Sequence, residues 1–296
     1  MPVVVLKVDV DTLRGTREGV PALLRLFERH GVRGTFLFSL GPDHTGRALK
    51  RVFRPGFLAK VRRTSVTSHY GLKTLLYGTL LPGPDIGRRA AAEMRAAAEA
   101  GHETGVHTWD HVLWQDSVAQ KDAAWTERQM LLAVERFVEI FKTAPTVHGA
   151  AGWQMNDAAL ELLGKLGFRV ASDTRGRTPF VPVVHGRECT PQYPTTLPTL
   201  DELIGRDGIT PDDVHEVLLK QSADGRDHVF TLHAELEGGQ LAPVMERLLA
   251  GWRAAGASMR TLGEYASQCD VASLPRAPVL RGTVEGRSGE LAVQGA

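Results

Sequence analysis

The chain lacks the features of an exported or membrane-spanning protein. It has two cysteines among 296 residues, at positions 189 and 269, in no metal-binding or redox spacing, which favours a reducing compartment. No apolar run reaches the roughly 18 residues of a membrane-spanning helix. The opening MPVVVLKVDVD turns acidic too early for a secretory signal peptide. We therefore expect a cytosolic protein without a membrane-spanning helix.

Several catalytic signatures are also absent. The sequence contains no G-x-S-x-G, and neither cysteine has a histidine partner nearby in the sequence, so nothing points to a serine or cysteine nucleophile. The absence of H-E-x-x-H makes a metallopeptidase a remote alternative. Aromatic residues are few and the net charge is only +1, so the composition gives no reason to expect nucleic acid as a partner.

The chain does contain a regular alternation of strand-like and helix-like segments. Short β-rich runs occupy 3–10, 34–40, 102–107, 144–150, 168–172 and 228–233, and helical patterns occupy 16–30, 86–100, 123–141, 156–166 and 245–254. This order is typical of βαβ units around a parallel sheet. We predict a single α/β domain over 1–296, folded as a closed or nearly closed (β/α) barrel. Residues 271–296 are expected to form a peripheral extension, in the form of a hairpin.

Polar residues gather where the predicted strands end. Asp9 and Asp11 end the first strand, and His107 and His111 follow the third. Asp173 follows the run at 168–172, and His233 ends the run at 228–233. A single aspartate after a strand is more often a cap or a turn residue. Five or six polar residues together at the carboxyl ends of strands indicate a site, because α/β barrels build their sites on that face.

The types of these residues indicate metal-assisted hydrolysis of an amide or ester. The two histidines of VHTWDH stand four residues apart, and with Asp11 they form a ligand set suited to Zn, Co, Mn or Ni. Asp9 is then the candidate base that takes a proton from water. His233 is the candidate acid for the leaving amine, and we expect Asp173 to hydrogen-bond its other nitrogen and keep it protonated.

VDVDT, HTWDH and TLH, in this order, resemble the motifs of the polysaccharide deacetylase family, the NodB-like metal-dependent carbohydrate esterases. The resemblance implies a distorted (β/α) barrel of about seven parallel strands. It assigns the role of base to Asp9 and the role of acid to His233. It also assigns the metal to Asp11, His107 and His111.

One motif of the family is missing. An Arg-x-Pro-aromatic motif usually follows the strand that matches APTVH, and its arginine steadies the base, but here the segment reads HGAAGWQ. Trp153 is a candidate for the aromatic residue. Arg14, Arg17 and Arg175 are candidates for the missing arginine, unless they are solvated surface residues. We expect substrate contacts from Arg14, Arg175, Trp153 and Glu235, although the last two are equally suited to a place behind the site.

Seven stretches narrow the resemblance: DVDTLRGTREGVP, GPDHTGR, HTWDHVLWQ, AGWQ, SDTRGRTPF, TLPTLDELIGRD and TLHAELEG. Together they are similar to one subfamily, the 4-deoxy-4-formamido-L-arabinose-phosphoundecaprenol deformylases of lipid A modification. This similarity implies removal of a formyl group from an aminoarabinose sugar carried on undecaprenyl phosphate. It also implies a peripheral location at the cytoplasmic face of the bacterial inner membrane, and a product that favours polymyxin resistance.

A lipid-linked substrate predicts a membrane-docking surface, and the charge distribution provides one. The 41 residues from 44 to 84 contain eight Lys or Arg and no Asp or Glu, so the rest of the chain carries a net charge of −7. Apolar residues at near-helical spacing run through this segment, and Pro55 divides it. We predict a basic amphipathic insertion after the second strand that docks on an anionic membrane, through Arg51, Phe53, Arg54, Phe57, Lys60, Arg62 and Arg63. The alternative is a partly buried insertion that covers the barrel.

Two other functions are open at this point. One is a broader carbohydrate or small-amide deacetylase whose basic insertion contacts an anionic soluble substrate. The other is a non-catalytic, membrane-associated metal-binding module. The presence of Asp9 and His233 argues against the second, because neither is needed to hold the ion. No obligate protein partner is evident from the sequence.

Overall fold

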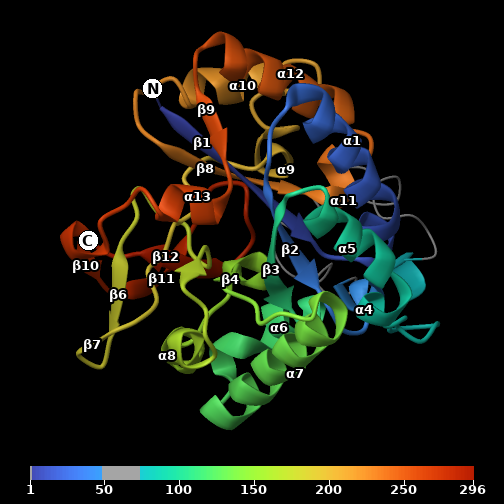
Figure 1. Cartoon of the computed structure of the whole chain (residues 1–296), viewed down its shortest axis with the longest axis vertical. Helices are drawn as coiled ribbons and strands as arrows, with labels where there is room; N and C mark the ends of the chain where they lie inside the picture. The colour runs from blue at the N-terminus through green and yellow to red at the C-terminus, as the bar shows by residue number, and fades with distance from the viewer. Residues whose placement is uncertain (1, 49–73) are drawn as a thin grey trace.

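The computed structural model describes residues 2–48 and 74–296, and its centre is a sheet of seven parallel strands (Figure 1). The strands follow the order β5-β4-β3-β2-β1-β8, and β9 pairs with the first half of β1. Within the described residues the sheet ends at β5 on one side and β8 on the other, so the barrel is open. This confirms the predicted distorted barrel. The bounds are β1 Val3–Val10, β2 Thr35–Ser39, β3 Glu103–Thr108, β4 Val147–His148, β5 Val170–Ala171, β8 His228–His233 and β9 Ser258–Arg260.

Helices cover the outside of the sheet. In Figure 1, α1, α5 and α7 lie along one side of it, and β6, β7 and the C-terminal hairpin lie on the other. The covering helices are α1 (Val20–His30), α5 (Ala91–Glu99), α7 (Ala123–Phe141), α8 (Asp157–Lys165), α10 (Val214–Gln221) and α12 (Ala242–Ala254). Shorter helices follow several strands: α4 (Ile86–Arg89), α6 (His111–Ser117), α9 (Leu200–Leu203), α11 (Ala234–Glu237) and α13 (Leu262–Ala266).

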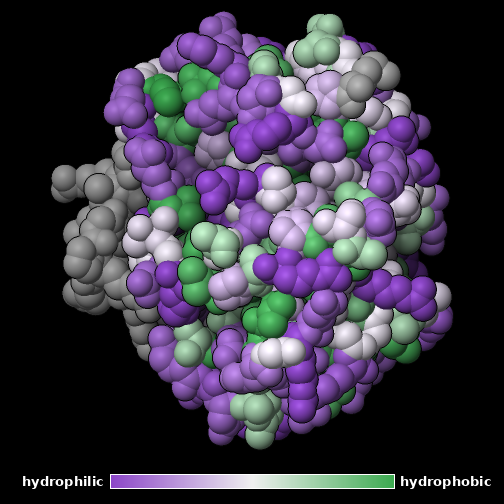
Figure 2. Space-filling model, turned by 90° about the vertical axis from the view of Figure 1, so that its left-hand side faces the viewer, coloured by the Kyte–Doolittle hydropathy of each residue, from purple (hydrophilic) through white to green (hydrophobic). Residues whose placement is uncertain are grey.

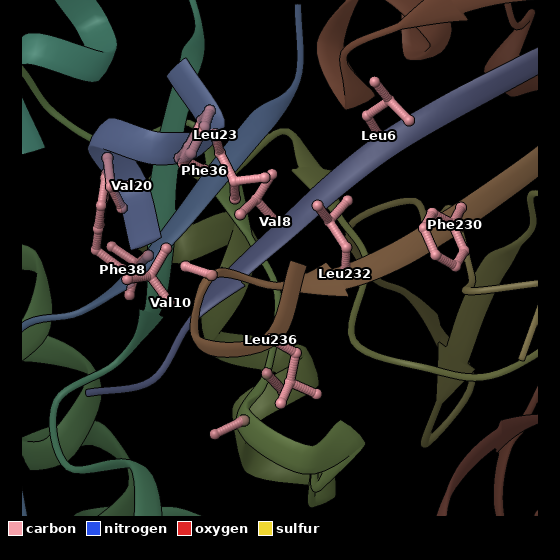
Figure 3. Close-up of a cluster of buried hydrophobic side chains, with 14 of the residues drawn as sticks. Leu6, Val8, Val10, Val20, Leu23, Phe36, Phe38, Phe230, Leu232 and Leu236 are labelled. Carbon is pink, nitrogen blue, oxygen red and sulfur yellow. The ribbon is translucent and has the colours of Figure 1, made fainter. Parts of the chain in front are cut away.

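Strand β1 separates a helix-covered face from an inner face. Leu6, Val8 and Val10 pack with Val20 and Leu23 of α1 in the larger core cluster (Figure 3). Val3 and Val5 belong to a second, smaller cluster. Because successive side chains of a strand point to opposite faces, the odd-numbered residues of β1 all point into the open barrel. Lys7 and Asp9 are therefore carried on the inner face by the alternation of β1 itself.

The element boundaries agree with the sequence where its signals were strong. The predicted strands at 3–10 and 228–233 and the predicted helix at 123–141 have the observed bounds. The helix expected at 86–100 is broken at Ala90, whose φ of −133° separates α4 from α5. The predicted helix at 16–30 begins with a π-helical turn, η1 (Gly15–Gly19), before α1.

The chain ends in a hairpin, as expected. Strands β11 (Val279–Thr283) and β12 (Glu290–Gln294) are antiparallel, and the backbone of Arg175 exchanges hydrogen bonds with Ala292 and Gln294. The hairpin is therefore joined to the loop after β5. A three-stranded sheet that the sequence did not suggest lies beside it, formed by β10 (Arg276–Ala277), β6 (Val181–Val184) and β7 (Arg187–Glu188).

Three observations relate to the expected absence of a membrane-spanning helix and to the expected membrane-docking surface. Within the described residues, no helix is both long and apolar enough to span a bilayer. Figure 2 shows mostly polar residues on the face that carries β6 and β7, with hydrophobic residues in small separate groups. Part of the predicted insertion, 49–73, lies outside the described residues. The same is true of the docking residues expected within it, Arg51, Phe53, Arg54, Phe57, Lys60, Arg62 and Arg63.

Candidate metal and catalytic site

The polar residues singled out by the motifs meet at the carboxyl ends of β1, β3 and β8. Asp9 of β1 is the register partner of His233 of β8, and Asp11 lies just beyond the end of β1. His107 is in β3, and His111 is the first residue of α6, which follows β3 directly. Parallel strands end at the same edge of a sheet, which brings residues from distant parts of the chain into one buried cluster.

Asp11, His107 and His111 form a group that could hold a metal ion, with one ligand atom of each lying within 4.8 Å of the others. Oδ1 of Asp11 is 3.2 Å from Nε2 of His107, and its Oδ2 is 3.4 Å from Nε2 of His111. Oδ1 of Asp11 is buried without a hydrogen-bond partner among the described residues. Two nitrogens and a carboxylate oxygen that face one another fit a divalent ion.

A backbone carbonyl orients His107, and the start of α6 places His111. Nδ1 of His107 donates to the carbonyl of Gly149 at 2.5 Å, which leaves Nε2 directed at Asp11. A carbonyl partner of this kind fixes the tautomer of a metal-binding imidazole. His111 is placed by the start of α6, where Asp110 accepts from the backbone N–H of Leu113. The other carboxylate oxygen of Asp110 is 2.6 Å from Nδ1 of His44.

The charges around Asp11 keep it ionised. Burial by itself would raise the pKa of Asp11, but the positive charge of His111, with further contributions from His107 and His233, holds that pKa below its ordinary range. Glu235 behaves in the opposite way, since burial and the charge of Asp11 raise the pKa of Glu235 to about 8. The surroundings therefore favour the charged form of Asp11 and the neutral form of Glu235.

Glu235 supports the backbone that carries Asp11. Its Oε1 accepts from the backbone N–H of Asp11 and from both the N–H and the hydroxyl of Thr12, at 2.8 to 3.1 Å. Gly15 is the residue that leaves room for it, because a Cβ there would lie 1.9 Å from Oε1. The side chain of Glu235 is buried, so its position fits a place behind the site.

Asp9 is paired with a residue that the sequence analysis did not consider. Nζ of Lys7 is 3.4 Å from Oδ2 of Asp9, and both side chains are buried. The other oxygen, Oδ1, lies 3.9 Å from Nδ1 of His107 and has no hydrogen-bond partner among the described residues. Burial lowers the pKa of Lys7, whereas the negative charges of Asp9 and Asp173 oppose that shift.

The expected hydrogen bond between Asp173 and His233 is wrong. Oδ1 of Asp173 is 2.6 Å from Nδ1 of His148, and its Oδ2 accepts from the side chain of Gln192 at 2.8 Å. Both oxygens of Asp173 are therefore engaged elsewhere. Nδ1 of His233 has no hydrogen-bond partner among the described residues, and its backbone N–H donates to Glu237 at 2.7 Å.

The three candidate arginines lie away from Asp9 or are engaged by other groups. Arg14 is half-exposed and pairs with Glu18 at 2.8 Å. Arg17 is exposed and donates to the carbonyl of Arg89. Arg175 is buried, but it donates to Glu202 at 2.6 Å and to the carbonyl of Leu197 at 3.1 Å. Proximity to a strand end in the sequence did not identify the partner of Asp9.

Trp153 lies beneath the site rather than at its surface, with an exposed fraction of 1%. Its indole N–H donates to Thr195 at 3.1 Å, and the cationic groups of Lys7, Arg175 and Arg287 lie 4.7 to 5.2 Å from the ring centre. Its φ of 52° is unusual for a bulky side chain and costs about 1–3 kcal/mol. These contacts hold Trp153 in a strained conformation between the sheet and the C-terminal hairpin.

One sequence signal would have found Lys7. In VVVLKVDV the lysine precedes Asp9 by two residues, so the alternation of a strand places both side chains on one face. A lysine inside an otherwise apolar, buried strand needs a buried partner. The pairing of His148 with Asp173 carries no such signal, because the two residues come from different strand ends that are 25 positions apart.

Comparison with known families and curated proteins gives a consistent set of similarities. Residues 2–171 match the family model described as polysaccharide deacetylase. The chain is 37% identical over 293 residues to the probable 4-deoxy-4-formamido-L-arabinose-phosphoundecaprenol deformylase ArnD of Shewanella sediminis, which covers 98% of this chain and 93% of that protein. It is 29% identical to the protein of the same name from Wigglesworthia glossinidia brevipalpis, over 95% of this chain and 98% of that one.

Solved structures share the fold at low identity. A crystal structure from Mycobacterium smegmatis, assigned by its description to the polysaccharide deacetylases, aligns with a TM-score of 0.66 at 18% identity, covering 95% of this chain and 94% of that chain. The Bacillus anthracis protein BA3943, described as a CE4 family pseudoenzyme, aligns with a TM-score of 0.52 at 10% identity, covering 88% of this chain and 64% of that one. Because a pseudoenzyme has the same fold, the fold alone does not decide catalysis.

Proposed function

This chain belongs to the polysaccharide deacetylase family and is an amide hydrolase, and we propose that it removes the N-formyl group of 4-deoxy-4-formamido-L-arabinose carried on undecaprenyl phosphate. The reaction gives the free amino sugar lipid and formate, and it serves lipid A modification and polymyxin resistance. The observation that carries the proposal is the similarity over 98% of the chain to a protein named as that deformylase. The cluster of Asp9, Asp11, His107, His111 and His233 supports it.

One divalent metal ion completes the proposed site, held by Asp11, His107 and His111. The residues fit such an ion, because Oδ1 of Asp11 is buried without a hydrogen-bond partner among the described residues, and Nε2 of both histidines faces that carboxylate. The donor set suits Zn, Co, Mn or Ni. When bound, the ion polarises the formamide carbonyl and lowers the pKa of water.

Asp9 acts as the general base in this proposal, and its free oxygen is the acceptor. Oδ2 is paired with Lys7, whereas Oδ1 is buried and has no hydrogen-bond partner among the described residues. Oδ1 takes a proton from the water that attacks the formyl carbon. His233, the register partner of Asp9 on β8, gives a proton to the sugar nitrogen as the C–N bond breaks. Nδ1 of His233 is buried and has no hydrogen-bond partner in the described part of the chain.

The residues expected around the substrate divide into two groups. Arg14 is half-exposed near the start of η1, and we retain it as a candidate contact to the sugar or its phosphate. Trp153, Arg175 and Glu235 are buried, and we propose that they support the site from behind. Asp173 supports the site indirectly in this proposal. Its hydrogen bond with His148 holds the end of β4, and the next residue, Gly149, accepts the hydrogen bond from His107.

We also propose that the protein docks peripherally on an anionic membrane, at the cytoplasmic face of the inner membrane. Support comes from the eight Lys or Arg and the absence of acids over 44–84. Leu80, which follows the undescribed segment, is 81% exposed. Vesicles with and without anionic lipid test this in a flotation assay. Arg62→Glu with Arg63→Glu should abolish flotation, whereas Lys121→Glu with Arg128→Glu, an equal charge change at exposed positions next to and within α7, should leave it intact.

The function itself is tested with metal-free protein. Purified protein is treated with a chelator, reloaded with Co, Mn or Zn, and offered the formamido lipid beside its acetamido analogue, with the free amine measured by mass spectrometry. Metal-dependent loss of formyl alone is the expected result. Hydrolysis of both amides would indicate a broader deacetylase. Hydrolysis of neither by protein that holds the metal would indicate the non-catalytic binding module.

A further inference from the structure

Lys7 is a buried lysine that none of the motifs includes. It is fully buried on the inner face of β1, two residues before Asp9, in a strand whose other residues are apolar. Its ammonium group has three N–H donors and three neighbours. These are the carbonyl of Ser172 at 3.0 Å, Oδ2 of Asp9 at 3.4 Å, and the ring of Trp153, whose centre is 5.2 Å away.

These three contacts come from separate parts of the fold. Ser172 follows β5, at the edge of the sheet opposite β8, and Trp153 follows β4 in the short helix η5 (Ala151–Trp153). The positive φ of Trp153 shows that its position is imposed by its surroundings. Lys7 therefore reaches across the inside of the barrel and is held at both ends, on β1 by its own backbone and on the far side by Ser172 and Trp153.

The space for this side chain depends on Gly149. A Cβ at position 149 would lie 3.0 Å from Cε of Lys7 and 2.3 Å from a methyl group of Leu37. Gly149 stands in the segment HGAAGWQ, where an arginine and a proline of the family motif are missing. The same segment thus lacks the family's cationic side chain and leaves room for a cation that reaches across the barrel from β1.

We infer that Lys7 is the positioning residue for Asp9, supplying from β1 the cation that this chain lacks after β4. Lys7 engages Oδ2 of Asp9 and so turns Oδ1, which has no partner among the described residues, toward the cluster of Asp11, His107 and His111. Within residues 2–48 and 74–296, Lys7 is the lysine or arginine that forms an ion pair with Asp9. The inference rests on the proposed role of Asp9 as base, and it does not require the substrate to be the formamido lipid.

Substitutions at Lys7 separate its charge from its hydrogen bonds. Lys7→Met removes both, Lys7→Gln keeps a donor for Ser172 without the charge, and Lys7→Arg keeps the charge. Each variant is loaded with metal, and metal content, kcat and KM are measured on whichever of the two amides the wild type hydrolyses. We expect Lys7→Met and Lys7→Gln to lower kcat by about 10²-fold with unchanged metal content and little change in KM. Lys7→Arg should retain at least about tenfold more activity than Lys7→Met.

The decisive comparison is made in an Asp9→Asn background. If Lys7 acts through Asp9, adding Lys7→Met to Asp9→Asn should change kcat by less than about twofold, because the group that Lys7 positions is already inactive. A further 10²-fold loss in that background would overturn the inference, and so would loss of the metal in Lys7→Gln. If Lys7→Met fails to fold, equal activities of Lys7→Gln and Lys7→Arg would overturn it as well. Failure of the deformylase proposal is seen separately, as wild-type protein that hydrolyses the acetamide but not the formamide.

Discussion

Nδ1 of His148 lies 2.6 Å from Oδ1 of Asp173, and both side chains are buried at the ends of β4 and β5. The same Oδ1 accepts from the backbone N–H of Ala150 at 2.8 Å, and Gln192 holds the other carboxylate oxygen. The pair thus connects two strand ends to the segment in which Gly149 orients His107. A carboxylate expected to hydrogen-bond the candidate acid, His233, instead supports the segment that orients His107.

Asp173→Asn should destabilise the fold, because one carboxylate oxygen becomes an NH₂ group that faces the donors of its neighbours. Leaving a buried donor unsatisfied costs about 1–3 kcal/mol, and urea unfolding at pH 7 would measure the loss. Burial alone would raise the pKa of Asp173, but His148 and Gln192 lower it overall. An aspartate whose pKa is lower in the folded than in the unfolded state stabilises the fold at pH values above its unfolded pKa of about 4. This stabilisation is lost as the pH falls through the folded-state pKa. The difference in the free energy of unfolding between wild type and Asp173→Asn should therefore become smaller in acid. A difference that stays constant down to pH 3 would contradict an ionised Asp173.

His107→Ala should lose metal and activity together. The imidazole supplies one of the three proposed ligand atoms, and Gly149 fixes its orientation. Two remaining ligands bind a divalent ion weakly, so the metal content after desalting should drop to the background of chelated wild-type protein. Elemental analysis and formate release are measured on the same sample. His215→Ala is the matched control, because His215 lies on α10 away from the cluster. Full metal occupancy in His107→Ala would mean that the metal binds at another site.

The motifs predicted those parts of the site that depend on local spacing. Asp9 lies near the end of β1 and Asp11 just beyond it, whereas His107 in β3 and His111 at the start of α6 are four residues apart. Each pair therefore follows from its own short segment. Strands β1 and β8 were predicted with their bounds because both are short runs rich in β-branched and other apolar residues. The partners of these residues depend on packing between distant segments. Asp173 and His148 meet because β4 and β5 are adjacent in the sheet, and no local pattern records that.

The partner of Asp9 also depends on packing between distant segments. Three arginines were considered because the family's motif uses arginine, whereas the residue in contact with Asp9 is a lysine two positions earlier. The alternation of β1 was visible in the sequence, but the distance that the lysine side chain spans inside the barrel was not. The lysine side chain has room to extend that far because Gly149 has no side chain. Glycine positions that make room for a distant residue cannot be identified before the strands are arranged in space.

Glu237→Gln should stabilise the protein at neutral and alkaline pH. Burial raises the pKa of Glu237 to about 8, so the folded state holds a proton that the unfolded chain releases near pH 4 to 5. A folded-state pKa above the unfolded value makes stability greatest in acid and decreasing as pH rises toward 8, by at most about 1.4 kcal/mol per pH unit for one proton. Glutamine is neutral throughout and keeps an acceptor for the backbone N–H of His233.

The measurement for Glu237 is the free energy of unfolding from urea titrations at pH 5, 6.5 and 8. The wild type should lose stability along this series relative to Glu237→Gln, and the two should agree most closely at pH 5. Glu216→Gln on α10 is the control, because it makes the same change at an exposed position. Parallel curves for wild type and Glu237→Gln across the series would mean that Glu237 is ionised in the folded protein.

The last prediction concerns the attachment of the C-terminal hairpin to the site. Glu202 is buried between two arginines, with Oε1 at 2.6 Å from Arg175 and 2.6 Å from Arg287, and both guanidinium groups lie against Trp153. Glu202→Gln breaks the buried ion pair with Arg175, which should cost about 3–5 kcal/mol of stability. The partly exposed Arg287 keeps its ion pair with Asp201. Glu188→Gln, which breaks an ion pair between the exposed Glu188 and Arg276, should leave the unfolding midpoint unchanged.

If the hairpin holds Trp153, and Trp153 holds Lys7, then Glu202→Gln should also lower kcat at temperatures where the variant is still folded, with the metal retained. Stability and turnover are measured on the same preparation, so that unfolding is separated from misplacement of Lys7. A variant that is destabilised but turns over at the wild-type rate would show that the hairpin stabilises the fold without contributing to the arrangement of Lys7 and Asp9. Because the contacts run from Arg287 through Trp153 to Lys7, we expect both quantities to fall.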